Sequence, residues 1–222
     1  MYASIVVTPH FTYGSVTCDG PAKTYTYTIN PTGQVDLPSD QVKCHGATTT
    51  VTYTTNNTVG TTTYTWTNDN TGIGLGATGT GNISFSATNT GTSPISGVIA
   101  VTPHFTYGSV TCDGPAKTYT ITVNPLGQVN QPDNQVICNN TSTTTVTFAT
   151  INTVGTTTYT WTNNHTDINL AASGTGDIIS FTATNSGTSP VMASIVVTPH
   201  FSYGSVTCDG PTKTYTLSLI HI

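Results

Sequence analysis

The chain has 222 residues, of which only 6% are charged, and its formal net charge is −5. It offers no basic face for nucleic acid, no apolar run long enough to span a bilayer, and too many hydrophobic residues, 35%, for a disordered chain. Threonine is abundant. It is β-branched, which suits a pleated strand, and its hydroxyl suits a face that meets water. The composition therefore predicts an all-β protein with few surface charges.

In chain order, the first recognisable element is a repeated block. The string PHFTYGSVTCDGPAKTYT begins at Pro9, recurs unchanged at Pro103 and recurs with two changes at Pro199. A second block, NTVGTTTYTWTN, begins at Asn57 and again at Asn152. Copies spaced by the length of a domain indicate tandem modules.

The module edges are expected at the Asn-Pro pairs, residues 30–31 and 124–125, because proline cannot continue a central strand. Residues 1–31 are then the C-terminal part of a truncated module, 32–125 a complete module and 126–222 a second module. The last residues, 217–222, leave the repeat and read LSLIHI, which resembles the translation of a sequencing adaptor. We therefore expect them to be adaptor-derived, and any signal peptide and anchor to lie outside this fragment.

Within the complete module, short alternating runs predict strands at 34–36, 41–44, 49–55, 62–67, 82–88, 97–102 and 117–123. Turn strings rich in Asn and Gly separate them, and no segment has helical periodicity. Six or seven short strands in about 95 residues are typical of an immunoglobulin-like β-sandwich. Trp66 and Trp161, one in each complete module, are expected to anchor the two cores.

The order of five strings, QVKCHG, TTTYTWTN, GATGTGNISFSATN, IAVTPHF and CDGPAKTYTITVNP, resembles the PKD-like repeats of large Bacteroidetes surface and gliding-adhesin proteins. The resemblance covers the chain up to residue 216. It implies tandem immunoglobulin-like (PKD-like) sandwiches in an extracellular array. The chain departs from PKD domains proper, whose turn reads WDFGDG, because Trp66 is followed by Thr67, Asn68 and Asp69.

The cysteines follow the repeat, so each complete module has an early cysteine (Cys44, Cys138) and a late one (Cys112, Cys208). The simplest pairing is Cys44–Cys112 and Cys138–Cys208, which leaves Cys18 unpaired by truncation. Each bridge would close a loop of about 70 residues. Against this, the two cysteines of a module can lie at opposite poles of the sandwich, too far apart to be bridged. Free thiols or a Cys18–Cys44 bridge across the linker remain as alternatives.

Three recurring polar features are candidates for chemistry. His10, His104 and His200 follow a proline that we expect to end a strand, and Asp19, Asp113 and Asp209 recur in a Cys-Asp-Gly-Pro turn. We interpret both sets as structural, since a catalytic residue has no reason to recur in every copy. Residues 68–72 faintly resemble a calcium loop, but the chain has no Glu. We expect no catalytic, cofactor or metal site within a module; calcium at module junctions is left open.

The sequence thus predicts a non-catalytic spacer or adhesive unit of a large bacterial surface or secreted protein, without cofactors. Its expected partners are neighbouring modules of the same chain and surface glycans or proteins; nucleic acid and membrane insertion within this fragment are not expected. One alternative is a glycan- or peptide-binding module that uses the divergent loops at 71–77 and 166–172. Another is an accessory domain of a secreted hydrolase.

Overall fold

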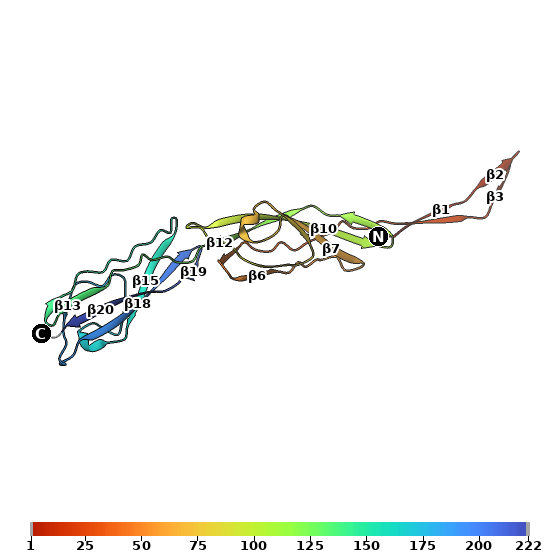
Figure 1. Ribbon diagram of the computed structural model, residues 1–222. Helices are drawn as coiled ribbons and strands as arrows, with labels where there is room; N and C mark the ends of the chain where they lie inside the picture. The colour runs from red at the N-terminus through yellow and green to blue at the C-terminus, as the bar shows by residue number, and fades with distance from the viewer. Residues whose placement is uncertain (1, 221–222) are drawn as a thin grey trace.

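The computed structural model describes residues 2–220, whose regular secondary structure consists of strands apart from two short 3-10 helical turns. The chain forms an elongated rod (Figure 1). A two-stranded ribbon of residues 2–31 lies at one end, residues 32–125 (the first module) in the middle, and residues 126–220 (the second module) at the other end. Neither of the helical segments in the described chain is long enough to cross a bilayer.

The first module has a main sheet in which β10 is central and β12 and β7 flank it. The order is β5 (Gln41–Cys44), β12 (Lys117–Asn124), β10 (Ile95–Tyr107), β7 (Thr61–Asn68) and β8 (Thr78–Thr80), with β11 (Val110–Asp113) folding back on the end of β10. Only β5 and β12 run parallel. The pair β6 (Thr48–Val51) and β9 (Ile83–Ser86) forms the opposing layer, and η1 (Thr71–Ile73) joins β7 to β8. This is an immunoglobulin-like sandwich.

The second module repeats this order. Its main sheet contains β13 (Gln135–Cys138), β20 (Lys213–Ile220), β18 (Val191–Tyr203), β15 (Thr156–Asn163) and β16 (Ser173–Thr175), with β19 (Val206–Asp209) on the end of β18. Its smaller layer contains β14 (Thr141–Ser142) and β17 (Thr182–Ala183), and η2 (Thr166–Ile168) corresponds to η1. The all-β, tandem immunoglobulin-like architecture predicted from the strand pattern is therefore confirmed.

Each module has its own hydrophobic core because alternate residues of its strands face inward. Ile99, Val101 and Ile121 are fully buried in the first core, and Trp66 packs in the same core with 9% of its surface exposed. Trp161 lies in the second core. The ring of Trp66 packs so closely against the backbone of Gly79 that a β-carbon there would lie 2.1 Å from the ring. The alternation predicted from the sequence is thus the physical basis of both cores.

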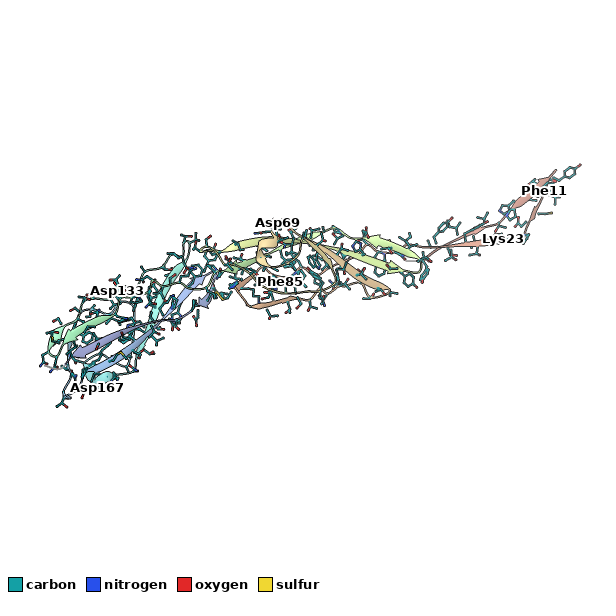
Figure 2. All side chains as sticks on the ribbon, in the orientation of Figure 1. Phe11, Lys23, Asp69, Phe85, Asp133 and Asp167 are labelled. Carbon is teal, nitrogen blue, oxygen red and sulfur yellow. A yellow bond between two sulfur atoms is a disulfide. The ribbon has the colours of Figure 1, made fainter. Side chains whose placement is uncertain are left out.

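The N-terminal ribbon consists of β1 (Tyr2–Val7) paired with β4 (Lys23–Thr28) and β2 (His10–Tyr13) paired with β3 (Val16–Asp19). Its apolar side chains are uncovered: Phe11 is 70% exposed, and Figure 2 shows it at the tip of the rod. The same residue in the complete copies, Phe105 and Phe201, is buried. The contrast shows that the remaining strands of a module are what cover this face.

Two local expectations were wrong. Pro103 does not end a strand but lies within β10. Proline has no backbone N–H to donate, but at Pro103 the strand that pairs with β10 changes from β12 to β11, so no ladder bond is lost. The carbonyl of Pro103 still accepts a hydrogen bond from the N–H of Gly114 at 2.8 Å. Residues 34–36 form no strand; Asp36 makes only a single backbone bond to Thr54.

The C-terminal residues that leave the repeat still extend the sheet. Leu217 and Leu219 are buried in β20, at the positions that Ile121 and Val123 occupy in β12. Of the residues expected to be adaptor-derived, 221 and 222 lie outside the described chain. Alternating apolar residues therefore suffice to complete the strand, whatever the origin of the string.

Candidate functional site at the module junction

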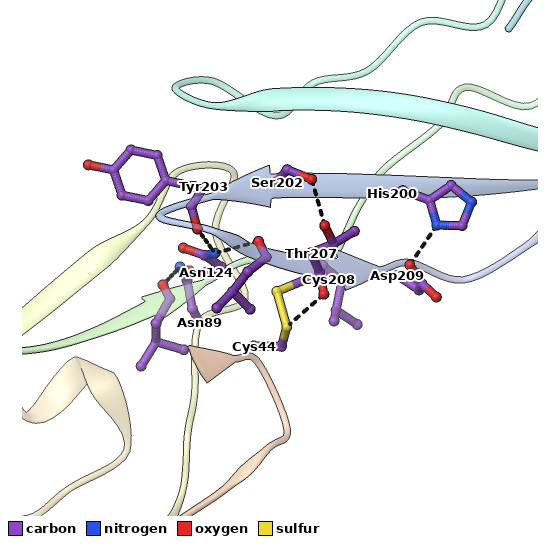
Figure 3. Close-up of a disulfide and its surroundings, with 12 residues drawn as sticks. Cys44, Asn89, Asn124, His200, Ser202, Tyr203, Thr207, Cys208 and Asp209 are labelled. Atoms are coloured by element: carbon purple, nitrogen blue, oxygen red, sulfur yellow. Dashed lines mark hydrogen bonds and ion pairs between the residues drawn. A yellow bond between two sulfur atoms is a disulfide. The ribbon is translucent and has the colours of Figure 1, made fainter. Parts of the chain in front are cut away.

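A disulfide crosses the junction between the two modules. It joins Cys44, the early cysteine of the first module, to Cys208, the late cysteine of the second, with the two Cα atoms 5.5 Å apart (Figure 3). The expected pairings Cys44–Cys112 and Cys138–Cys208 are therefore wrong, and the alternative Cys18–Cys44 is also excluded because Cys44 is already bonded. Cys18, Cys112 and Cys138 are free thiols.

The poles of the sandwich explain why the intramodular pairing fails. Cys44 pairs in register with Asn124, beside the start of β10 at Ile95, whereas Cys112 pairs with Phe105. The two cysteines are thus separated by about ten residues along β10, which is roughly 30 Å at the rise of an extended strand. A disulfide tolerates Cα separations of less than about 7 Å. The early cysteine therefore lies at the C-terminal pole of its module and the late one at the N-terminal pole.

The hairpin formed by the end of β18 and by β19, which we call the late hairpin of the second module, reaches back to the first module. Its β19 strand lies beside β5. Its turn contains Gly204 and Ser205, both at positive φ, which fits a tight two-residue hairpin turn. A β-carbon on Gly204 would lie 3.1 Å from the side chain of Val42, so the turn packs directly on β5.

Asn124, the last residue of the first module's β12, holds this hairpin through its side chain. It is completely buried, and its Nδ2 donates to the carbonyl oxygens of Tyr203 at 2.9 Å and Val206 at 3.5 Å. A second bond crosses the junction from the N–H of Thr153 to the carbonyl of Thr92 at 2.8 Å. The junction is therefore a buried polar and covalent contact and not merely a flexible linker.

A hollow lies beside the linker, between the two modules. His45 and Asn89 line it from the first module, and Pro211 and Lys213 from the second. None of its lining residues carries a carboxylate, and Lys213 adds a positive charge. Calcium prefers several carboxylate and carbonyl oxygens, so the chemistry of this hollow does not suit it.

The recurring His and Asp residues tie each late hairpin to its own sheet. His104 Nδ1 lies 2.6 Å from Asp113 Oδ1, and His104 Nε2 lies 2.8 Å from Thr65 Oγ1. The second module has the same Thr160, His200 and Asp209 arrangement. His10 and Asp19 keep only the first contact, since the ribbon lacks the strand that would supply the threonine.

The order of hydroxyl, imidazole and carboxylate resembles a catalytic triad, and sequence reasoning did not foresee the threonine. A triad also needs N–H donors aimed at a developing oxyanion. Thr65 lies in the interior of the sheet, paired with Thr102 on β10 and with Thr80 on β8, so its backbone is engaged in the two ladders. The contacts of His104 join β11 of the late hairpin to β7 of the same sheet.

The loop that resembles a calcium site is held by its own polar side chains. Asn68 is buried and its Nδ2 donates to the carbonyl of Leu75 at 2.9 Å, while Asp69 accepts from the N–H of Val98 at 2.7 Å. Asn163 and Asn164 do the same in the second module. Within residues 2–220 there is no cluster of three or more His, Cys, Asp or Glu side chains that could hold a metal.

No protein-family model and no curated protein matches the sequence. Among solved structures, mouse cadherin-23 EC22-24 is similar over 100% of this chain and 75% of its own, with 13% identity and a TM-score of 0.39. The fibronectin(III)-like modules of Clostridium thermocellum CbhA match 85% of this chain and 94% of theirs, with 11% identity and a TM-score of 0.34. The titin I9-I11 tandem matches 85% and 99%, with 11% identity and a TM-score of 0.29. The description of this chain as tandem immunoglobulin-like repeats rests on its own strand order and cores.

Proposed function

We propose that the chain is a non-catalytic spacer segment of an extracellular or cell-surface protein, in which rigid modules transmit tension along the rod. The observation that carries the proposal is the Cys44–Cys208 bridge across the module junction. Disulfides persist in oxidising compartments and are rare in the cytosol. The resemblance to PKD-like repeats of Bacteroidetes adhesins supports a bacterial surface protein as the parent.

The position of the bridge suits a mechanical role. A force applied to the two ends passes from residue 44 to residue 208 through the disulfide, so the residues between them are protected from extension. The sequence separation of the two cysteines is 164 residues. At about 3.6 Å per extended residue, reduction would release roughly 600 Å of chain. The same bridge and the buried Asn124 keep the two modules aligned when no force acts.

Single-molecule pulling on the full chain, with handles at its two ends, tests the proposal. We expect the oxidised chain to extend only through its terminal segments, and addition of a reductant to expose a further length of roughly 600 Å. Cys208→Ser should behave like the reduced chain from the start, while Cys112→Ser, the matched control, should behave like the unmodified one. Equal extension of oxidised and reduced chains would contradict the proposed role in carrying tension.

A further inference from the structure

The two thiols that remain in the complete modules occupy the positions of the two bridged cysteines. Cys112 pairs with Phe105 as Cys208 pairs with Phe201. Cys138 begins its module in the way that Cys44 does, at the end of a short strand parallel to the last strand of the sheet. Cys112 and Cys138 are both half-buried and unpaired. Each module therefore has one unused half of the bridge that the junction shows.

A second observation shows that the other end of the first module is built as a junction of the same kind. Asn30, which precedes the linker proline as Asn124 does, donates its Nδ2 to the carbonyl of Tyr107 at 3.1 Å. Asn124 makes this bond to Tyr203 at 2.9 Å. The late hairpin of the first module thus contacts the ribbon through Asn30. The late hairpin of the second module contacts the first module in the same way, through Asn124. The ribbon contains the late Cys18 but no early cysteine, so Cys112 has no partner there.

We propose that in an array of this repeat the early cysteine of every module is bonded to the late cysteine of the next module, so that every junction is closed covalently. Cys138 is the site for the late hairpin of a following module. Cys112 is the site for the early cysteine of a complete preceding one. A single rule then gives each of the five cysteines an early or a late position, with Cys18 in the late one.

The chemistry is that of thiol–disulfide exchange. Two cysteine thiols form one S–S bond and give up two protons and two electrons to an oxidised disulfide, which leaves as two thiols. A small disulfide oxidant such as oxidised glutathione supplies these equivalents. Placement of the late hairpin beside the early cysteine, by the asparagine and the packed turn, raises the local concentration of one thiol near the other and selects this pair.

The pairing rule limits how far a fully bridged array can extend. Between one late cysteine and the next early cysteine, Cys112 to Cys138, the chain runs in one direction along the rod: up β12, through the linker and along the second module to β13 (Figure 1). This segment has about 26 residues and spans at most about 90 Å when fully extended. When every junction is bridged, the shortest covalent route along the array runs through such segments and the disulfides that join them. Each segment crosses two modules and is already nearly straight, so an oxidised array could scarcely lengthen even if its sheets were disrupted.

The test is a chain in which residues 32–125 are duplicated in tandem, produced in an oxidising compartment and mapped by peptide mass spectrometry without reduction. We expect two bridges per molecule: Cys44 of the first copy with Cys112 of the second copy, and Cys44 of the second copy with Cys208. Because the copies have the same peptides, two variants identify the partners. Cys112→Ser in the second copy should remove one bridge, whereas Cys112→Ser in the first copy should leave both.

The bridge from the second copy to Cys208 reports that the duplicated chain has folded, so a failure to form the new bridge is informative. The proposal is overturned if only that bridge forms, if the first-copy variant is the one that loses a bridge, or if the new bond links separate molecules on a denaturing, non-reducing gel. These results concern connectivity alone. The predicted disulfide map, found together with no mechanical difference on pulling, would reject the proposed tension-carrying function and leave the pairing rule standing.

Discussion

Asn124 is completely buried and donates its side-chain N–H to the carbonyl oxygen of Tyr203, 2.9 Å away on the neighbouring module. The contact sets the hairpin that carries Cys208 at a fixed place beside Cys44. The same bond between Asn30 and Tyr107 at the other end of the module shows that the geometry belongs to the repeat and not to one junction.

Replacement of Asn124 by alanine should weaken the bridge between the modules. The partly buried carbonyl of Tyr203 would lose its partner, which costs about 1–2 kcal/mol. We expect the equilibrium constant for forming Cys44–Cys208 in a glutathione redox buffer to fall roughly tenfold. Asn30→Ala removes the equivalent bond at a junction without a disulfide, and it should leave this constant unchanged. If both variants behave alike, Asn124 does not position the hairpin.

His200 should influence the same equilibrium from within the second module. Its imidazole joins Asp209 to Thr160 and so holds β19 against the main sheet. His200→Ala should let the late hairpin move and lower the equilibrium constant for the bridge by roughly threefold to tenfold, the value of one or two hydrogen bonds. His10→Ala, in the hairpin of the ribbon, is the matched control. An unchanged constant for His200→Ala, measured by thiol trapping after redox equilibration, would show that the hairpin is rigid without it.

The sequence predicted the fold well because its signals are local. Alternating strands, the turn residues and one tryptophan per module all follow from the chain itself, and the cores contain Trp66 and Trp161. The disulfide could not be assigned in this way, since pairing depends on which pole of the module each cysteine occupies. The recurrence of Asn before Pro at residues 30 and 124 indicates a module boundary from the sequence alone, and the structure shows that the same asparagines also bind the next hairpin.

Gly79→Ala should destabilise the first module. The new methyl group would overlap the ring of Trp66, which is held on its other side by the core. Overpacking of this kind costs about 1–3 kcal/mol, or more when the backbone must move. Gly76→Ala provides the control, because its nearest neighbour is a carbonyl oxygen at 3.8 Å and its φ is not positive. Urea unfolding followed by tryptophan fluorescence should show a lower midpoint for Gly79→Ala only; equal midpoints would mean that the strand β8 shifts without cost.

Alkaline pH should destabilise the second module through Tyr215. Burial raises the pKa of its phenol to about 12, whereas a tyrosine in the unfolded chain titrates near pH 10. Between these values the unfolded chain loses its proton and the folded module keeps it, so stability is complete below about pH 10 and falls as the pH rises toward 12. The slope from one group is at most about 1.4 kcal/mol per pH unit.

Tyr215→Phe is the variant that isolates this effect. Tyr215 corresponds to Tyr119 of the first module, whose hydroxyl lies 2.9 Å from that of Tyr53. The second core has Phe148 at the position of Tyr53, so the Tyr215 hydroxyl has no tyrosine partner there to lose. We expect Tyr215→Phe to keep its stability above pH 10 better than the unmodified chain, with equal stability at pH 8. The measurement is urea unfolding from pH 8 to 11.5 in a background with Cys18, Cys112 and Cys138 changed to Ser, which prevents disulfide exchange. Parallel loss of stability in both chains would show that Tyr215 ionises as freely in the folded module as in the unfolded one.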